Sequence, residues 1–259
     1  MPNKSSNIPL IPSFKYEKDL LCEGYDWIIG LDEVGRGSLA GPVMVGAAVI
    51  GIKQVKENYM PEGLADSKLL SEKRREELYE PLQKWCTTWA VGSCTNTEID
   101  EWGISYALGV AALKAISKVE EDIKKLSFSV NANSGANSGA NSGANSGAKL
   151  GANSNFRIAA ILDGPCDYID KVANTFDAPY IPEPVKVHTL VKADRQCASV
   201  AAAAVLAKVT RDNLMVSLAK NPKYAAYDWE SNKGYGSLAH RNAIKKVGPS
   251  DLHRLSWHL

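Results

Sequence analysis

The feature that most constrains this chain is an apolar run, residues 27–31, that leads straight into two adjacent acids and a Gly-Arg-Gly triplet in the stretch LDEVGRGSLAGPV. A second apolar and β-branched run, residues 43–50, follows it. Two such runs joined by a glycine-bearing segment predict two neighbouring strands, and a hairpin is the simplest geometry. Because successive side chains of a strand point to opposite faces, one of Asp32 and Glu33 is expected to turn towards whatever covers the sheet.

The acidic pair and its glycines have two interpretations. A solvated turn after a strand accounts for the acids and the glycines without any chemistry. A buried acid, in contrast, needs a partner, and Arg36 is near enough in the sequence to be one. Gly35 and Gly37 favour a close approach of the backbone to another molecule. This stretch alone leaves both interpretations open.

The composition is that of an ordinary globular chain. The 259 residues are 45% hydrophobic and 23% charged, which is enough to bury a substantial core, and one main domain is expected. The 30 Lys and Arg against 29 Asp and Glu leave a formal net charge of +1. A nucleic-acid partner would therefore have to bind through a locally basic surface.

The spacing of the cysteines and the hydropathy of the chain indicate its cellular compartment. The 5 cysteines show no Cys-x-x-Cys spacing, which indicates neither a disulfide framework nor a zinc module and fits a reducing cytoplasm. The first 16 residues are polar and interrupted by prolines. Because no apolar run reaches the roughly 18 residues of a bilayer span, we expect a cytoplasmic chain that is neither secreted nor membrane-bound.

Later segments predict helices that cover a sheet. The helical patterns are residues 66–85, 95–126 and 197–219, and the strand patterns are residues 156–162 and 185–194. The segment from Val91 gives no clear pattern. Strands followed by helices, with one early hairpin, predict an α/β fold with a mixed sheet flanked by helices.

Two further segments differ from the rest in composition. Residues 131–155 form a tandem Ala-Asn-Ser-Gly repeat with almost no charge and little apolar bulk. Such a segment cannot build a core and predicts a flexible inserted loop, while its tetrapeptide period is too short for a solenoid. The tail from Ser231 onward is locally basic.

Four acids recur at or just after strand-like runs: Asp32, Glu33, Asp163 and Asp194. If the strands are neighbours, these carboxylates converge and need a hard divalent cation to neutralise them. No histidine accompanies them at metal-ligand spacing, which argues against zinc and for Mg²⁺ or Mn²⁺. Two ions about 3.5–4 Å apart would support phosphodiester hydrolysis. Solvated loop edges give the same pattern, so the pattern alone leaves that alternative open.

The ordered motifs of the chain resemble those of type 2 ribonuclease H, ribonuclease HII. The matching stretches, from about Trp27 to Trp257, are GLDEVGRGSLAGPV, DSKLLSEKRREEL, LDG, VKADRQCASVAAAAVLAKVTRD, NKGYGSLAHRNAI and GPSDLHRLSW. The resemblance implies a ribonuclease H-like fold with a small helical C-terminal extension. It implies a cytoplasmic endonuclease, dependent on Mg²⁺ or Mn²⁺, that cuts the RNA strand of RNA-DNA hybrids and incises duplex DNA 5′ of embedded ribonucleotides, leaving 3′-hydroxyl and 5′-phosphate ends.

The resemblance also assigns roles to residues. The four metal-binding and catalytic acids would be Asp32, Glu33, Asp163 and Asp194. Gly35, Arg36 and Gly37 would form a backbone clamp on the ribose 2′-hydroxyl, and Tyr235 would stack against the ribonucleotide sugar. Lys68, Lys208 and Arg211 would contact phosphates. The alternatives are a buried core tyrosine for Tyr235 and solvated side chains for the cations. Asp212 matches no metal-ligand position and is expected to face solvent or pair with a base.

Three departures from the family pattern matter. Ser38 stands where the family usually has proline, which predicts a looser turn. Gly103 replaces a commonly seen asparagine, which puts one polar contact to the substrate strand in doubt. The repeat before the LDG strand is not a family feature and is expected to bulge outward.

The expected organisation is a polar N-terminal extension (residues 1–26), a catalytic domain (27–220) and a C-terminal substrate-binding segment (221–259). The related ribonuclease HIII would need an N-terminal domain, for which about 26 residues leave no room, and normally has glutamate where this chain has Asp194. A monomer is expected, with a DNA sliding clamp as a candidate partner of the N-terminus. The rival classes are a catalytically silent nucleic-acid-binding module, whose signature would be a lost acid, and an interaction protein that uses the repeat.

Overall fold

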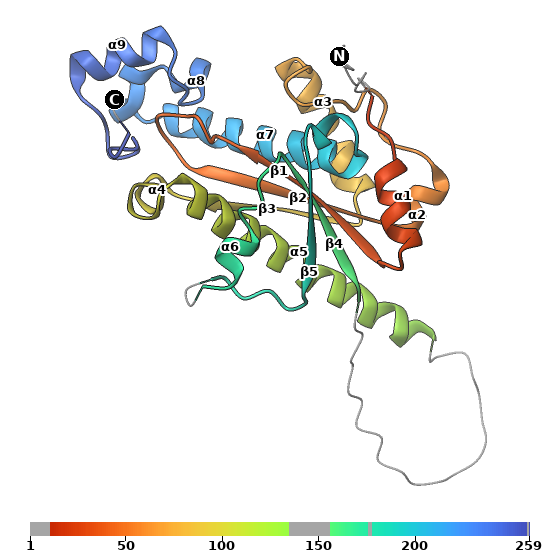
Figure 1. Cartoon of the computed structure of the whole chain (residues 1–259). Coiled ribbons are helices and arrows are strands. Elements are labelled where there is room, and N and C mark those ends of the chain that lie inside the picture. Colours follow the sequence, from red (N-terminus) through yellow and green to blue (C-terminus); the bar gives the residue numbers. More distant parts are fainter. Residues whose placement is uncertain (1–10, 135–155, 176–177, 258) are drawn as a thin grey trace, which may run out of the picture.

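A computed structural model of the chain describes residues 11–134, 156–175, 178–257 and 259. Within these ranges, five strands form one mixed sheet in the order β3-β2-β1-β4-β5, between two layers of helices (Figure 1). The strands are β1 (Trp27–Val34), β2 (Val43–Gly51), β3 (Thr88–Cys94), β4 (Ile158–Asp163) and β5 (Val185–Leu190). The predicted α/β fold with a mixed sheet flanked by helices is confirmed.

The strand pairing confirms the predicted hairpin. β1 and β2 are antiparallel, with Trp27 opposite Gly51 and Val34 opposite Met44. β3 adds to β2 in antiparallel orientation, while β1, β4 and β5 are parallel to one another. The sequence assigned no element to β3, because its Gly-Ser-Cys end has little β propensity.

Helices cover both faces of the sheet. One face carries α5 (Ile104–Ser134), with α4 (Asn96–Trp102) and α6 (Asp170–Ala173) beside it. The other carries α7 (Ala198–Ala219), with α3 (Glu72–Trp85), α1 (Lys15–Cys22) and α2 (Ile52–Glu57). Beyond one end of α7, α8 (Trp229–Asn232) and α9 (Leu238–Val247) form the predicted C-terminal extension (Figure 1). None of the helices in the described ranges is long and apolar enough to cross a membrane.

Alternation along β1 decides which way each acid points. Ile29 and Leu31 belong to the core cluster on the α5 face, and Ile28 belongs to a cluster with residues of α7. Continuing the alternation places Asp32 on the α7 face and Glu33 on the α5 face. The expectation that one acid turns inward is therefore confirmed, because Asp32 is only 5% exposed.

Helix boundaries differ from the sequence patterns at two points. α3 begins at Glu72, later than predicted, because the Asp66 carboxylate accepts the Lys68 backbone N–H at 2.8 Å and holds this segment as a turn. The helix predicted over residues 95–126 is broken at Gly103, whose φ is +78°. Of the predicted repeat loop, residues 131–134 end α5, and residues 135–155 lie outside the described residues.

Two strand glycines let the helical layers approach the sheet closely. A Cβ on Gly30 would lie 2.2 Å from the carbonyl carbon of Ser199 in α7. A Cβ on Gly92 would lie 2.0 Å from the carbonyl oxygen of Ala111 in α5. Both neighbours are backbone atoms, which cannot rotate away. The short distance between the sheet and the helices therefore depends on the absence of a side chain at Gly30 and at Gly92.

Replacing Gly92 with alanine should destabilise the protein by about 1–3 kcal/mol, because the added methyl group overpacks the interface with α5. Urea unfolding followed by far-UV circular dichroism measures the change. Ser93→Ala, at an exposed position of the same strand, is the matched control and should change stability by less than about 0.5 kcal/mol. Equal midpoints for the two variants would show that the layers are not in tight contact here.

The described part of the predicted N-terminal extension packs on the main fold. Phe14 and Leu20 are buried, and Glu17 of α1 is completely buried. Glu17 Oε1 accepts hydrogen bonds from the backbone N–H and the hydroxyl of Ser199, both at 2.9 Å. It thus caps the first turn of α7 from a different helix. Burial raises the pKa of Glu17 to about 7.

The Glu17 pKa predicts a pH dependence of stability. A carboxyl group with a pKa of about 7 when folded and an ordinary value of 4.5 binds its proton more tightly in the folded state. The stability that Glu17 contributes is therefore fully present below its unfolded pKa of 4.5 and is lost as the pH rises through its folded pKa of about 7. Relative to Glu17→Gln, the wild type should lose up to about 3 kcal/mol between about pH 4.5 and pH 8. Urea unfolding across this range tests it, with Glu76→Gln on the exposed side of α3 as the control.

Candidate active site

The strand register places two aspartates side by side. β1 and β4 are parallel, and Leu31 of β1 pairs with Leu162 of β4. The next residues are Asp32 and Asp163, and alternation puts both carboxylates on the α7 face. The predicted convergence of acids from neighbouring strands is observed for this pair.

Asp194 joins the pair from a turn after the neighbouring strand. It lies on a 3₁₀ turn, Ala193–Arg195, that follows β5. The backbone N–H of Ala193 donates to Asp163 Oδ1 at 2.7 Å, which ties this turn to the end of β4. Lys68 Nζ lies 3.8 Å from Asp194 Oδ2.

Glu33 points to the opposite face and has different partners. Its Oε1 accepts from Arg36 Nη1 at 3.2 Å, and its Oε2 accepts from the Tyr168 hydroxyl at 3.3 Å. Burial, followed by the charge of Glu33, raises the pKa of Tyr168 well above its usual value, so this hydroxyl stays protonated and donates. Tyr168 has no signal in the sequence other than its closeness to the LDG motif.

The electrostatics show that negative charge is concentrated here. Burial raises the pKa of Asp32 well above its ordinary value, and the carboxylates of Asp163 and Glu33 raise it further. Burial, then Asp163, raises the pKa of Asp194 to about 6. Burial lowers the pKa of Lys68, but Asp32 and Asp194 reverse this and raise it overall. Lys68, with a side chain 74% exposed, offsets part of the negative charge.

The donors suit a hard divalent cation in their chemistry. All four predicted ligands are carboxylates, which Mg²⁺ and Mn²⁺ prefer. As the side chains lie, however, no group of three or more His, Cys, Asp or Glu in the described ranges is arranged to hold a metal ion. Glu33, Asp163 and Asp194 each have a donor of the protein itself as a partner. Asp32, Asp163 and Asp194 lie together, with Glu33 on the opposite side of β1, and their role as cation ligands stays a prediction.

The glycine-containing loop and Tyr235 meet beside these acids. The Gly35 N–H donates to the Tyr235 hydroxyl at 3.2 Å, and Lys208 Nζ lies 5.3 Å from the centre of the Tyr235 ring. Lys208 is also paired with Asp212 at 2.8 Å, which confirms the expectation that Asp212 pairs with a base. A cavity of about 270 Å³ is bordered by Asp32, Glu33, residues 35–37, Lys68, Lys208 and Tyr235. Of the predicted site residues, only Asp163, Asp194 and Arg211 do not border it.

The prediction that Arg211 contacts a phosphate is wrong for this structure. Its side chain is completely buried, and its guanidinium donates to Ser38 Oγ at 2.7 Å and to the carbonyl oxygens of Pro42, Lys233 and Ala40. Periodicity along α7 could not reveal this, because the partners come from distant segments. Arg211 therefore stabilises the loop that contains Ser38, Ala40 and Pro42.

Arg254 is a second buried support that the sequence reasoning missed. It donates to the Gly35 and Arg36 carbonyl oxygens at 2.6 and 2.9 Å, and to Ser38 Oγ at 3.0 Å. Burial, followed by the positive charge of Arg211, lowers the pKa of Arg254 to about 9. The only signal for it was its place in the quoted stretch GPSDLHRLSW.

Two departures from the family pattern have structural explanations. Ser38 was predicted to loosen its turn, but it does not. It is fully buried, and its hydroxyl lies 2.9 Å from the Gly35 carbonyl oxygen and accepts from both Arg211 and Arg254. Gly103 separates α4 from α5, and a Cβ there would meet nothing within 4 Å, so this position leaves open space.

Comparisons with known proteins show the family of this chain. The sequence model of the family described as Ribonuclease HII matches residues 29–259. The chain belongs to the ribonuclease HII family. Ribonuclease HII of Streptomyces avermitilis is 36% identical over 247 residues, which is 95% of this chain and 83% of that protein. Ribonuclease HII of Clostridium acetobutylicum is 36% identical over 230 residues, or 89% of this chain and 71% of that one.

Solved structures share the ribonuclease H fold. Ribonuclease H2 from Pyrococcus horikoshii superposes with a TM-score of 0.58 at 23% identity, covering 90% of this chain and 94% of that chain. Ribonuclease HII in the PCNA complex from Archaeoglobus fulgidus gives a TM-score of 0.59 at 21% identity, covering 90% and 95%. The predicted ribonuclease H-like fold is confirmed, and the family makes this chain a metal-dependent ribonuclease H endonuclease.

Removing the Ser38 hydroxyl, which accepts from both Arg211 and Arg254, tests whether these arginines stabilise the loop. Ser38→Ala leaves two buried guanidiniums without an acceptor that now lies at 2.7 and 3.0 Å. A buried donor without a partner costs about 1–3 kcal/mol, so thermal and urea unfolding should show a loss of that size. Ser231→Ala, which removes an exposed hydroxyl, is the control and should cost less than about 0.5 kcal/mol. A neutral Ser38→Ala would mean that the arginines do not depend on this oxygen.

Proposed function

We propose that the chain incises duplex DNA on the 5′ side of an embedded ribonucleotide and cuts the RNA strand of RNA-DNA hybrids, leaving 3′-hydroxyl and 5′-phosphate ends. The observation that carries this proposal is the placement of Asp32 in one cavity with the Gly35–Gly37 loop and Tyr235. Groups suited to phosphodiester hydrolysis lie next to groups suited to contact a ribose. The 2′-hydroxyl is the only local difference by which such a site could select RNA.

The cation requirement follows from the acids. Two divalent cations, Mg²⁺ or Mn²⁺, would activate a water molecule and stabilise the leaving oxygen when bound. Asp32, Asp163, Asp194 and Glu33 are proposed as their ligands. Bst-RNase HIII, a structural neighbour with a TM-score of 0.57 and 19% identity, has been solved in complex with Mn²⁺.

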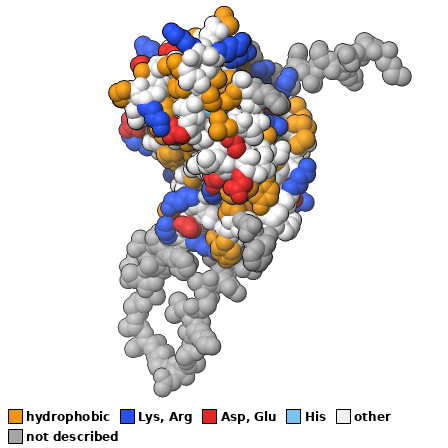
Figure 2. Space-filling view, turned by 90° about the vertical axis from the view of Figure 1, so that its left-hand side faces the viewer, with side chains coloured by type: hydrophobic (Ala, Val, Ile, Leu, Met, Phe, Trp, Pro, Cys, Tyr) orange, Lys and Arg blue, Asp and Glu red, His pale blue; other side chains and the backbone are white. Residues whose placement is uncertain are grey.

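The remaining groups are proposed to position the substrate. Tyr235 would pack against the sugar of the ribonucleotide, with its hydroxyl held by the Gly35 N–H. Lys68 and Lys208 border the same cavity and would contact phosphates on either side of the sugar. The formal net charge is only +1, and the face drawn in Figure 2 carries acidic, basic and hydrophobic side chains interspersed. Phosphate affinity would therefore come from such local cations rather than from a general positive field.

The cellular setting is proposed from the same facts. The described cysteines, including the buried Cys86, Cys94 and Cys197, are all free, which suits a reducing cytoplasm. Ribonucleotide excision repair is the process that such an incision would start. A sliding clamp is a candidate partner, since an archaeal ribonuclease HII of this fold has been solved with PCNA.

Replacing Asp163 with asparagine should abolish metal-dependent cutting, because one carboxylate ligand is lost while the shape is kept. The loss should exceed the roughly 100-fold that removal of an outer-shell partner typically causes. The substrate is a duplex DNA with one ribonucleotide, mapped at nucleotide resolution with Mg²⁺ and with EDTA. Asp122→Asn, an aspartate on α5 whose carboxylate pairs with Lys125, is the control and should cut normally.

Three results would count against the proposal. A cut that is insensitive to EDTA would exclude cation-dependent hydrolysis. A cut at positions unrelated to the ribonucleotide would exclude ribose selection. Binding without any cut, on both this duplex and an RNA-DNA hybrid, would favour the catalytically silent binding module.

A further inference from the structure

A second, larger cavity shares a wall with the proposed ribose site. It has a volume of about 540 Å³ and is bordered by Glu33, Arg36, Asp163, Trp102, Tyr106 and Lys171, among others. Glu33 and Arg36 border both cavities. A nucleic-acid strand that places a ribose in the smaller cavity therefore meets this larger one directly past the acids.

An aromatic pair forms one side of the larger cavity. Trp102, the last residue of α4, is 39% exposed, although most large hydrophobic side chains of this fold are buried. Its ring lies 5.8 Å from that of Tyr106 at an interplanar angle of 72°, an edge-to-face contact that fixes both rings. The Tyr106 hydroxyl is in turn 2.8 Å from Thr175 Oγ1. The exposed indole is thus rigidly held.

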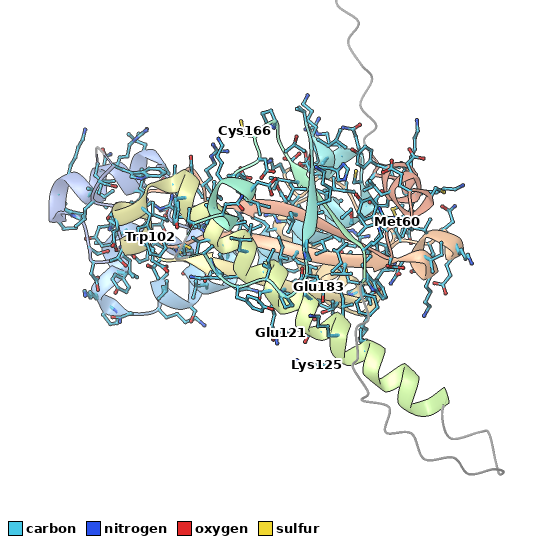
Figure 3. All side chains as sticks on the ribbon, turned by 60° about the horizontal axis from the view of Figure 1, so that its bottom comes forward. Met60, Trp102, Glu121, Lys125, Cys166 and Glu183 are labelled. Atoms are coloured by element: carbon cyan, nitrogen blue, oxygen red, sulfur yellow. The ribbon has the colours of Figure 1, made fainter. Side chains whose placement is uncertain are left out.

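Two glycines keep the entrance open. Gly103 follows Trp102 directly, and Gly164 borders the cavity after Asp163. Both have positive φ values, of +78° and +105°, and a Cβ on either would meet nothing within 4 Å. In Figure 3, Trp102 lies at the end of α4 and Cys166, another residue bordering the cavity, lies in the loop after β4. Neither glycine therefore carries a side chain that could narrow the cavity beside Trp102 or Asp163.

The charges around the cavity suit a phosphodiester strand. Two cations, Arg36 and Lys171, border the cavity together with Glu33, Asp163 and Asp167. The Arg36 side chain is 58% exposed beside its partner Glu33, and Lys171 is exposed as well. Aromatic rings interleaved with cations are the usual means of holding a strand without reading its sequence, because rings pack on sugars and bases while cations pair with phosphates.

We propose that this cavity binds the deoxynucleotide whose 3′ oxygen is the leaving group, with its sugar or base packed on Trp102 and its own 5′ phosphate near Lys171. The inference rests on the proposed function, since it takes the ribose site as the reference point. Trp102 would then bind the substrate on one side of the cleaved bond, and Tyr235 would bind it on the other side. The two aromatic side chains would then hold the strand on either side of the acids.

The test combines a variant with a truncated substrate. The full duplex carries one ribonucleotide. The truncated duplex has the same complementary strand, but its cut strand begins at the 5′-phosphorylated ribonucleotide, so the deoxynucleotides that would enter the larger cavity are missing. Binding is measured by fluorescence anisotropy in EDTA, and cleavage of the full duplex is measured with Mg²⁺.

Trp102→Ala should weaken binding of the full duplex about 10-fold, in line with the loss of one stacking contact. Its affinity for the truncated duplex should stay within about twofold of the wild type, because the contact is absent there. Trp102→Phe should restore most of the binding, since it keeps an aromatic face. Tyr180→Ala is the matched control, because Tyr180 is 78% exposed and does not border this cavity.

The opposite results are distinguishable. If Trp102→Ala binds both duplexes like the wild type, or weakens both equally, the proposal for this cavity is overturned while the cleavage activity stands. If the wild type itself neither binds nor cuts the full duplex, the proposed function has failed instead. Urea unfolding of each variant separates loss of a contact from loss of the fold.

Discussion

The site depends on the parallel register of β1 and β4, which sets Asp32 beside Asp163 at the sheet edge. Like charges buried next to each other are unfavourable: burial raises the pKa of Asp32, and the carboxylates of Asp163 and Glu33 raise it further. The surrounding structure offsets it with Lys68 and with the Ala193 N–H. These groups offset only part of the negative charge, which is the physical ground for the proposed cation site.

A second constraint is the pair of buried arginines that hold the loop proposed to contact the ribose. The hydrogen bonds described above for Arg211 and Arg254 go to uncharged oxygens, mainly backbone carbonyls of residues 35–42. Buried guanidiniums are costly, so their retention needs many well-directed bonds. These bonds fix the conformation of a loop that contains three glycines, Gly35, Gly37 and Gly41. Ser38 links the two arginines and so couples α7 to the C-terminal segment.

The sequence predicted those parts of the fold that depend on local pattern. Alternation and apolar runs gave β1, β2, β4, β5 and α7, and strand-end acids gave Asp32, Asp163 and Asp194. It did not predict the break at Gly103 or the late start of α3, because a turn held by Asp66 looks like a helix start in one dimension. It misplaced Arg211 for a physical reason: an arginine on a helix looks solvated until carbonyls from two distant segments are known to converge on it.

Glu33 and Arg36 connect the two constraints, because both border the ribose-side cavity and the larger cavity beyond it. Arg36 follows Gly35 in the loop, and both of their carbonyl oxygens are held by Arg254. A change in the C-terminal segment can therefore alter the wall common to both cavities without touching any substrate atom. Since a displacement of about 1 Å can cost two orders of magnitude in rate, the proposed ribose contact would depend on buried arginines that are not themselves proposed to touch the substrate.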